Sequence, residues 1–181
     1  MGQGSDELAG RAAIVTGSAR NIGRAIALNL AAGGASVLIN ARQSRDEAEA
    51  VVAEITGGGG TALVHMADVT IPDQAAAMVA AAASAFGRLD ILVNNVSRRG
   101  QSPLGEMSFE LWRAVLAGTL DAAFLCTKAA LPHLKQSGAA AIINIGGVAG
   151  HAGFPERAHV AAGKAGLAGM TGALAPELAA F

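Results

Sequence analysis

The chain has 181 residues, of which 52% are hydrophobic and 15% charged, and its formal net charge is −1 at pH 7. These values are typical of one compact globular domain, which we expect to cover residues 1–181, and they exclude a disordered or fibrous protein. A chain so close to neutral has no basic surface for nucleic acid or anionic lipid, so we expect neither partner.

The sequence indicates neither a signal peptide nor a transmembrane helix. The first ten residues are polar and acidic and lack the apolar core of a signal peptide. Apolar runs are interrupted before they reach about 20 residues, the length of a transmembrane helix, so we expect none and predict a cytoplasmic protein. The single cysteine, Cys126, excludes an internal disulfide, and its apolar neighbours favour a structural thiol over a reactive one.

Short apolar runs alternate with longer amphipathic ones along the chain. Five runs are typical of strands covered on both faces, at 12–16, 36–40, 61–66, 91–94 and 140–145. Helices are expected at 22–32, 44–55, 73–86, 108–135 and 158–180, with glycines at 33–34 and 57–60 as stops. This alternation predicts an α/β fold, a doubly wound, Rossmann-like parallel sheet of about five strands.

The first strand leads into a glycine-rich loop, T-G-S-A-R-N-I-G at 16–23, and then directly into a helix. Gly17 permits a tight turn, Gly23 lets the helix pack on the strand, and the helix N-terminus offers unpaired N–H groups to a pyrophosphate. Asn21 stands where a third glycine is usual, and asparagine tolerates a positive φ. We predict a phosphate-binding loop, with a plain tight turn as the alternative.

Three motifs in this order resemble the short-chain dehydrogenase/reductase family, most closely its 3-oxoacyl-(acyl-carrier-protein) reductase type. They are T-G-x-x-x-x-I-G, then Asp68-Val69 after the third strand, then L-V-N-N at 92–95. The resemblance spans nearly the whole chain. It implies that Asp68 hydrogen-bonds the adenine amine, that Val69 packs on the adenine ring, and that Asn94 lies against the cofactor ribose while Asn95 stabilises the central strand.

The end of the second strand indicates which nicotinamide cofactor is bound. An acidic residue there usually holds the ribose hydroxyls of NAD, but this chain has Ala41 followed by Arg42. Arg42 and Arg20 would make charge-assisted contacts to a 2'-phosphate, so we predict NADP rather than NAD, with two solvated surface arginines as the alternative. The predicted cofactor site comprises Gly17, Ser18, Arg20, Asn21, Ile22, Gly23, Arg42, Asp68, Val69, Asn94 and Lys164.

Carbonyl reduction needs a proton donor beside the developing alkoxide. The resemblance implies a tyrosine with a lysine four residues later, a serine thirteen residues before the tyrosine, and an asparagine in the preceding long helix. With Lys164 aligned to that lysine, the other three positions hold Val160, Gly147 and Thr119. The chain contains no tyrosine at all, so it cannot use the family's proton donor.

Lys164 is therefore the remaining catalytic candidate, and two histidines are candidate substitutes for the missing acid. His151 lies on the loop after the fifth strand, where ligands bind in such sheets. His159 is one residue from the vacant tyrosine position, but one residue along a helix is a turn of about 100°, so it should face elsewhere.

The resemblance also implies a sixth strand, a substrate-covering segment and a seventh strand after the last helix, and the sequence contains none of them. A fragment of a longer protein and a degraded family member both fit this observation. The fifth strand should then be a sheet edge, and Pro176 should kink or end the last helix.

We expect an NADP-dependent oxidoreductase acting on a small carbonyl or alcohol substrate, with low or no activity as it stands and with no metal. The alternative is a non-catalytic nucleotide-binding or interaction protein. The resemblance implies a homodimer or homotetramer through the helices at 108–135 and 158–180, unless these pack only on their own sheet.

Overall fold

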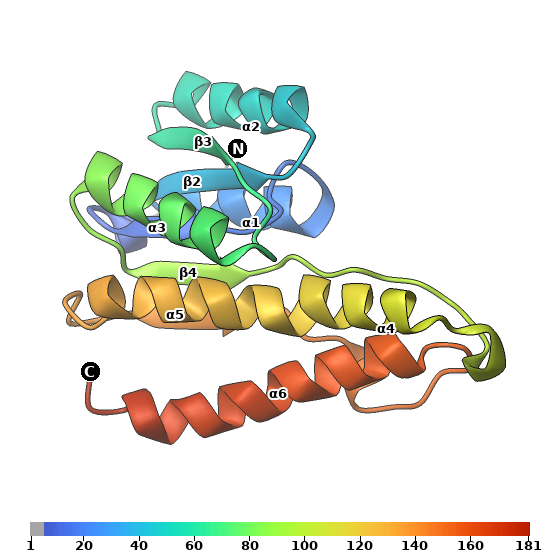
Figure 1. Cartoon of the computed structure of the whole chain (residues 1–181). Coiled ribbons are helices and arrows are strands. Elements are labelled where there is room, and N and C mark those ends of the chain that lie inside the picture. Colours follow the sequence, from blue (N-terminus) through green and yellow to red (C-terminus); the bar gives the residue numbers. More distant parts are fainter. Residues whose placement is uncertain (1–5) are drawn as a thin grey trace.

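The computed structural model describes residues 6–181, and its centre is a five-stranded parallel sheet with strand order β3-β2-β1-β4-β5 (Figure 1). The strands are β1 (Ala12–Val15), β2 (Ser36–Ala41), β3 (Ala62–Met66), β4 (Ile91–Asn94) and β5 (Ala141–Asn144). The helices are α1 (Asn21–Ala32), α2 (Arg45–Gly57), α3 (Pro72–Phe86), α4 (Phe109–Leu116), α5 (Ala122–Leu134) and α6 (Ala158–Leu178). The α/β, doubly wound architecture predicted from the alternating pattern is confirmed.

Helices cover both faces of the sheet, and each face has its own apolar core. On one face α3 and α5 pack against β1 and β4 through residues such as Met78 and Cys126. On the other face α1 and α2 pack through residues such as Ala27 and Val51. The central strands β1 and β4 are buried along their whole length, which explains why their sequences carry no charge.

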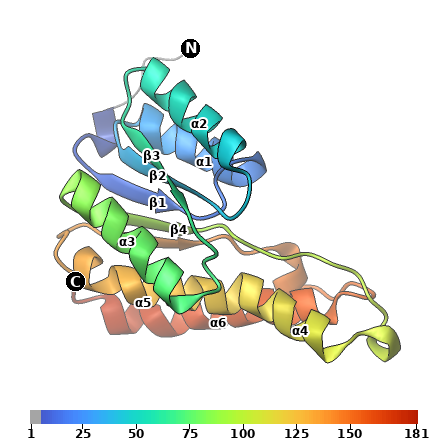
Figure 2. The same cartoon turned by 45° about the horizontal axis from the view of Figure 1, so that its top comes forward.

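The last helix lies beside the long one rather than over the middle of the sheet (Figures 1 and 2). α6 contacts α4 and the turn that joins α4 to α5, and it reaches the sheet only at β5. β5 pairs with β4 alone, and no described residue pairs with its other side, as expected for an edge strand. Ile143 in this strand is 43% exposed.

The helix predicted over 108–135 contains a break that the sequence did not indicate. A π-helical segment, η3 (Ala117–Asp121), joins α4 to α5. Gly118 lies in this segment, and a Cβ there would stand 3.0 Å from the Cβ of Arg98, so the absence of a side chain lets the 97–99 loop approach closely. Such π segments are often found at functional sites.

Of the two outcomes expected at Pro176, a kink or the end of the helix, the second does not occur, because α6 continues to Leu178. A proline inside a helix removes one N–H and leaves the carbonyl four residues earlier without a partner. Here that carbonyl belongs to Gly172, which is exposed, so water can satisfy it. The cost of the proline is therefore small enough for the last turn to form.

The continuous helical stretch 109–134 is, by length and composition alone, apolar enough to cross a membrane. It packs along α3, β4 and α6, so we interpret it as a core helix. Cys126 within it is fully buried, and this burial raises the pKa of its thiol to about 12. A thiol with so high a pKa is a structural group rather than a nucleophile.

Candidate functional site

Two adjoining pockets lie at the carboxyl ends of the strands, where ligands bind in sheets of this type. The larger pocket, of about 1030 Å³, is bounded by the loop after β1 and by the ends of β2 and β3. The second, of about 580 Å³, contains Lys164 and is called the lysine pocket below. Both are lined by Ile22, Asn95, Ser97 and Arg99, so they form one continuous cleft.

The glycine-rich loop turns sharply before α1. Gly17 has φ +61°, and Asn21, the first residue of α1, has φ +51°. The expectation that asparagine adopts the usual glycine conformation here is confirmed. No side chain caps this end of α1, so its first N–H groups are available at the larger pocket.

Gly23 is the tightest position of the loop. A Cβ built there would lie 2.4 Å from the carbonyl oxygen of Gly17 and 2.6 Å from Nδ2 of Asn95. Both contacts are far inside van der Waals distance, and the first is to backbone. The loop can therefore close on α1 only because residue 23 is a glycine.

Hydrogen bonds with residues at the ends of neighbouring strands hold the glycine-rich loop in place. Asn40, buried at the end of β2, accepts from the N–H of Gly17 at 3.1 Å and donates to the carbonyls of His65 and Ala67. Ser18 is fully buried; its hydroxyl donates to the carbonyl of Val15 and accepts from the N–H of Asn40. Ser18 lines neither pocket, and in this structure its hydroxyl anchors the loop.

The expectation that Asn95 stabilises the central strand is confirmed, because it hydrogen-bonds to Thr16 and Gly17 directly after β1, whereas Asn94 lies apart from the cleft. Asn94 is buried away from both pockets and donates to Thr127 and Asn144. Asn95 lines both pockets, and its Nδ2 also donates to the carbonyls of Thr16 and Gly17. Successive side chains of a strand point to opposite faces, so only one of the two can reach the cleft.

The arginines expected to select NADP lie at the rim of the larger pocket, each beside a carboxylate. Arg42 Nη1 is 3.4 Å from Asp68 Oδ2, and Arg20 Nη1 is 3.9 Å from Glu47 Oε2. Burial by itself raises the pKa of Asp68, but hydrogen bonds from Thr70 and Arg42 outweigh it and hold that pKa below the ordinary 3.8. Asp68 is thus ionised at neutral pH and lines the pocket together with Val69.

Lys164 is the one cation on this side of the cleft that is largely buried. Its ammonium donates to the carbonyl of Ile145, at the end of β5. Burial lowers the pKa of Lys164, and the positive charge of Arg99 lowers it further. Gly147 and Val160 line the same pocket, so the positions aligned with the family's serine and tyrosine do lie beside the lysine, without a hydroxyl.

The other three candidates do not reach the lysine pocket. Thr119, at the position aligned with the asparagine, is buried in η3, with its hydroxyl 3.3 Å from that of Ser97. His151 is exposed and lines neither pocket. His159 is completely buried, and neither ring nitrogen has a hydrogen-bond partner among residues 6–181. Its Nε2 faces Gly100, behind the wall of the pocket.

Several lining residues were not singled out from the sequence. Ser97, Arg98 and Arg99 follow the two asparagines after one intervening residue, Val96, and Arg157 immediately precedes α6. Ser97, Arg98 and Arg99 could have been found from the sequence, because they come just after a strand at the carboxyl edge of a parallel sheet, where ligands bind. Arg157 carries no comparable sequence signal.

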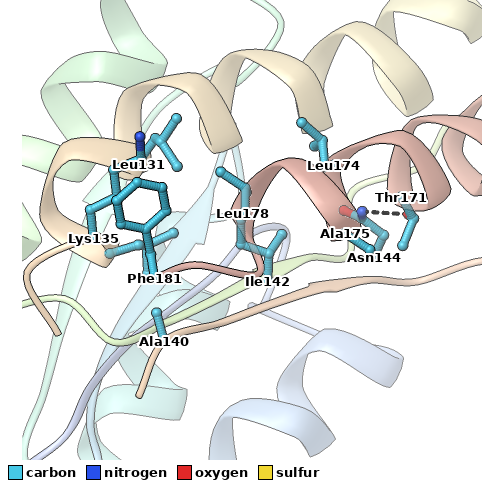
Figure 3. A pocket seen from close by; sticks show the side chains of 11 residues that line it. Leu131, Lys135, Ala140, Ile142, Asn144, Thr171, Leu174, Ala175, Leu178 and Phe181 are labelled. Atoms are coloured by element: carbon cyan, nitrogen blue, oxygen red, sulfur yellow. Dashed lines mark hydrogen bonds between the residues drawn. The ribbon is translucent and has the colours of Figure 1, made fainter. Parts of the chain in front are cut away.

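A third pocket, of about 210 Å³, lies between α5, β5 and the C-terminal half of α6, away from the cleft (Figure 3). Its walls are mainly apolar, with Leu131, Leu174 and Leu178 among them. Its polar groups are already engaged: Asn144 donates to Thr171 at 2.8 Å, and the Lys135 ammonium lies 4.0 Å from the centre of the Phe181 ring. Within residues 6–181, no cluster of histidine, cysteine or carboxylate side chains is arranged to hold a metal.

Comparisons with known proteins agree with this geometry. The family described as short chain dehydrogenase matches residues 11–181. The chain is 42% identical over 172 residues to a 3-oxoacyl-[acyl-carrier-protein] reductase of Synechocystis sp., covering 95% of this chain and 70% of the relative. It is 40% identical over 169 residues to a reductase of the same name, FabG, from Staphylococcus aureus, covering 93% and 69%. A solved structure of a dehydrogenase/reductase from Sinorhizobium meliloti superposes with a TM-score of 0.92 at 35% identity, covering 98% of this chain and 70% of that one.

Proposed function

The chain belongs to the short-chain dehydrogenase family of NAD(P)-dependent oxidoreductases, and from that premise we propose that its larger pocket binds NADP in preference to NAD. The observation that carries the proposal is the loop around Gly23, where backbone and helix N-terminus are packed so closely that no side chain fits. An exposed row of N–H groups at a helix N-terminus is a binding site for phosphate. The pocket volume is also sufficient for an elongated ligand.

The preference for NADP follows from the charges at the end of β2. No acidic residue stands there to accept hydrogen bonds from ribose hydroxyls, whereas Arg20 and Arg42 both lie at the rim. Their side chains are 69% and 61% exposed, so they can turn from Glu47 and Asp68 toward a 2'-phosphate at little cost. Arg42 also balances the charge of Asp68, which then accepts a hydrogen bond from the adenine amine.

The proposed reaction is hydride exchange with a carbonyl or alcohol in the lysine pocket, at a low rate or not at all. NADPH, when bound, supplies the hydride. The protein must supply a proton, but Val160 and Gly147 carry no hydroxyl. Lys164, held by the carbonyl of Ile145, can still position the ribose of the cofactor. Loss of a positioned general acid alone costs a factor of roughly 10² to 10⁴ in rate.

The test is calorimetric titration with NADP⁺ and NAD⁺. We expect NADP⁺ to bind more tightly, and Arg42→Asp to reverse the preference by repelling the 2'-phosphate and offering a carboxylate to the ribose. If neither nucleotide binds below millimolar concentration, the proposal fails. With NADPH and simple ketones or 3-oxoacyl thioesters, turnover near the enzyme median of about 10 per second would show that another group supplies the proton.

A second candidate function, a non-catalytic nucleotide-binding or interaction protein, is favoured by the same missing hydroxyls. It would use the exposed aromatic side chains of the long helical stretch, Phe109 (70% exposed) and Phe124 (50% exposed), as part of a homodimer or homotetramer interface. Size-exclusion chromatography with light scattering tests this interface, because a protein that is strictly monomeric at micromolar concentration cannot form a homodimer or homotetramer through it.

A further inference from the structure

The lysine pocket has an unusual balance of charge. Arg99, Arg157 and Lys164 line it, and no aspartate or glutamate does. The larger pocket differs, because two of its arginines, Arg20 and Arg42, lie beside carboxylates. Arg98 and Arg99, which also line the larger pocket, are in no such pair, so the two pockets differ in that only the larger one contains a carboxylate, Asp68.

The ion pairs of residues 6–181 leave seven lysines and arginines without a carboxylate within 4.0 Å, and the three cations of the lysine pocket are among these seven. Among residues 6–181, six arginines lie within 4.0 Å of a carboxylate: Arg20, Arg24, Arg42, Arg45, Arg88 and Arg113. Arg99, Arg157 and Lys164 are in none of these pairs. Arg157 is half-buried and Lys164 is largely buried, so water screens their charges incompletely.

Arg99 and Lys164 moreover repel each other. The charge of Arg99 lowers the pKa of Lys164, in addition to the larger effect of burial, which places the two cations within electrostatic reach across the pocket. A ligand that brings a negative charge between them removes this repulsion. A neutral ligand of the same shape leaves it in place.

Besides the cations, the polar side chains that line the lysine pocket are neutral ones, Asn95, Ser97 and Gln101. Phe154, Val148 and Val160 form an apolar side, and Gly147 leaves space but offers no side-chain donor. The neutral hydroxyl donors of the family are absent at Val160 and Gly147. The strongest donors left are the guanidinium groups, whose geometry suits a carboxylate.

We propose that the lysine pocket binds small substrates that carry a carboxylate, such as oxo acids, with the carboxylate held by the cations Arg99, Arg157 and Lys164 and the apolar part against Val160 and Phe154. The proposal rests on the proposed function, since the carbonyl of such a substrate would face the cofactor. A phosphate of the cofactor is the other anion within reach, because Arg99 also lines the larger pocket.

The test measures binding of acetoacetate and of its neutral methyl ester by protein NMR, without cofactor. Arg99→Gln and Arg157→Gln are compared with the wild type and with Arg45→Gln, a charge-matched control on the exposed side of α2 that lines neither pocket. We expect acetoacetate to bind more tightly than the ester, and each pocket variant to weaken acetoacetate about tenfold while Arg45→Gln does not. The same spectra report whether each variant is folded.

The proposal is overturned if acetoacetate does not bind at millimolar concentration, or if acetoacetate and its ester bind equally tightly. It is also overturned if Arg45→Gln weakens acetoacetate binding as much as the pocket variants do. A parallel titration with NADP⁺ separates the two anions. If the pocket variants weaken NADP⁺ but not acetoacetate, the cations serve the cofactor and the proposal is wrong. If acetoacetate shows the expected pattern while NADP⁺ does not bind, the carboxylate site stands and only the proposed cofactor function fails.

Discussion

The two sides of the cleft are built on the same sheet edge but differ in how their polar groups are held. On the side of the glycine-rich loop, Asn40 and Asn95 together donate to four backbone carbonyls, and Ser18 closes the network. On the other side, Lys164 has one hydrogen bond, and the aligned neighbours Val160 and Gly147 have no side-chain polar group. This difference is the basis of our proposal that the chain keeps residues for binding a nucleotide but lacks the family's proton donor.

The largest effect expected from breaking the loop side comes from Gly23→Ala. The new Cβ would lie 2.4 Å from a backbone oxygen, which cannot move without shifting the loop or α1. We expect a loss of about 3 kcal/mol in the free energy of unfolding, measured by urea denaturation. Gly169→Ala in α6 is the control: its Cβ meets nothing within 4 Å, so it should be neutral or stabilising, and an equal loss in both variants would contradict the packing argument.

Asn40→Leu is compared with Thr119→Val, which changes a buried polar group of η3 that lines neither pocket. Loss of the Asn40 amide leaves the N–H of Gly17 and the carbonyls of His65 and Ala67 without their partner, at a cost of about 2 kcal/mol. Thr119→Val removes only a long contact to Ser97, at a cost of about 0.5 kcal/mol. Equal losses of stability in chemical denaturation would contradict the claim that the Asn40 hydrogen bonds hold the loop more firmly than the Thr119–Ser97 contact holds η3.

A smaller effect is expected from Asp68→Asn and depends on acid pH. The pKa of Asp68 is lower in the folded chain than its ordinary 3.8, so the unfolded chain binds the proton more readily. The stability that Asp68 contributes is then complete above the unfolded pKa and is lost as pH falls through the folded pKa. The variant should lose less stability than the wild type on acidification, as followed by thermal unfolding. Parallel curves would refute the argument.

The smallest effect is expected from Lys164→Met, on the alkaline side. The pKa of Lys164 is lowered in the folded chain from its ordinary 10.5, so between the two values the unfolded chain holds more protons. Its contribution to the free energy of unfolding therefore rises with pH in that window. The free energy of unfolding of the wild type, measured by urea denaturation relative to that of the variant, should rise toward pH 10.5. A relative stability that does not change with pH would contradict the lowered pKa.

Much of the fold was predictable because it depends on patterns that the sequence carries locally. Each predicted strand overlaps the observed one with ends that differ by at most one residue, since buried parallel strands are short apolar runs between turn signals. The π segment at Ala117–Asp121 was not predictable, because the apolar pattern continues through it without a break, and the contact of its Gly118 with Arg98 is a tertiary one. The continuation of α6 past Pro176 likewise depends on the exposure of Gly172.

The site was predictable in position but not in the direction of individual side chains. The loop residues and Lys164 line the cleft as expected from their places after strands. Ser18 and Asn94 point away from it, and Asn95 points into it, which depends on which face each residue takes at the end of its strand. Arg157 reaches the lysine pocket from a loop, and loop paths follow no sequence period.

The central claim is that the nucleotide side is competent while the proton donor is missing, and single-turnover kinetics with NADPH test both parts together. The measurement compares the wild type with Val160→Tyr/Gly147→Ser, following NADPH binding by fluorescence and its oxidation by absorbance with a 3-oxoacyl thioester. We predict the same dissociation constant for NADPH in both proteins, and oxidation faster in the variant by a factor of roughly 10² or more. Rapid oxidation by the wild type, or no NADPH binding by either protein, would contradict the account.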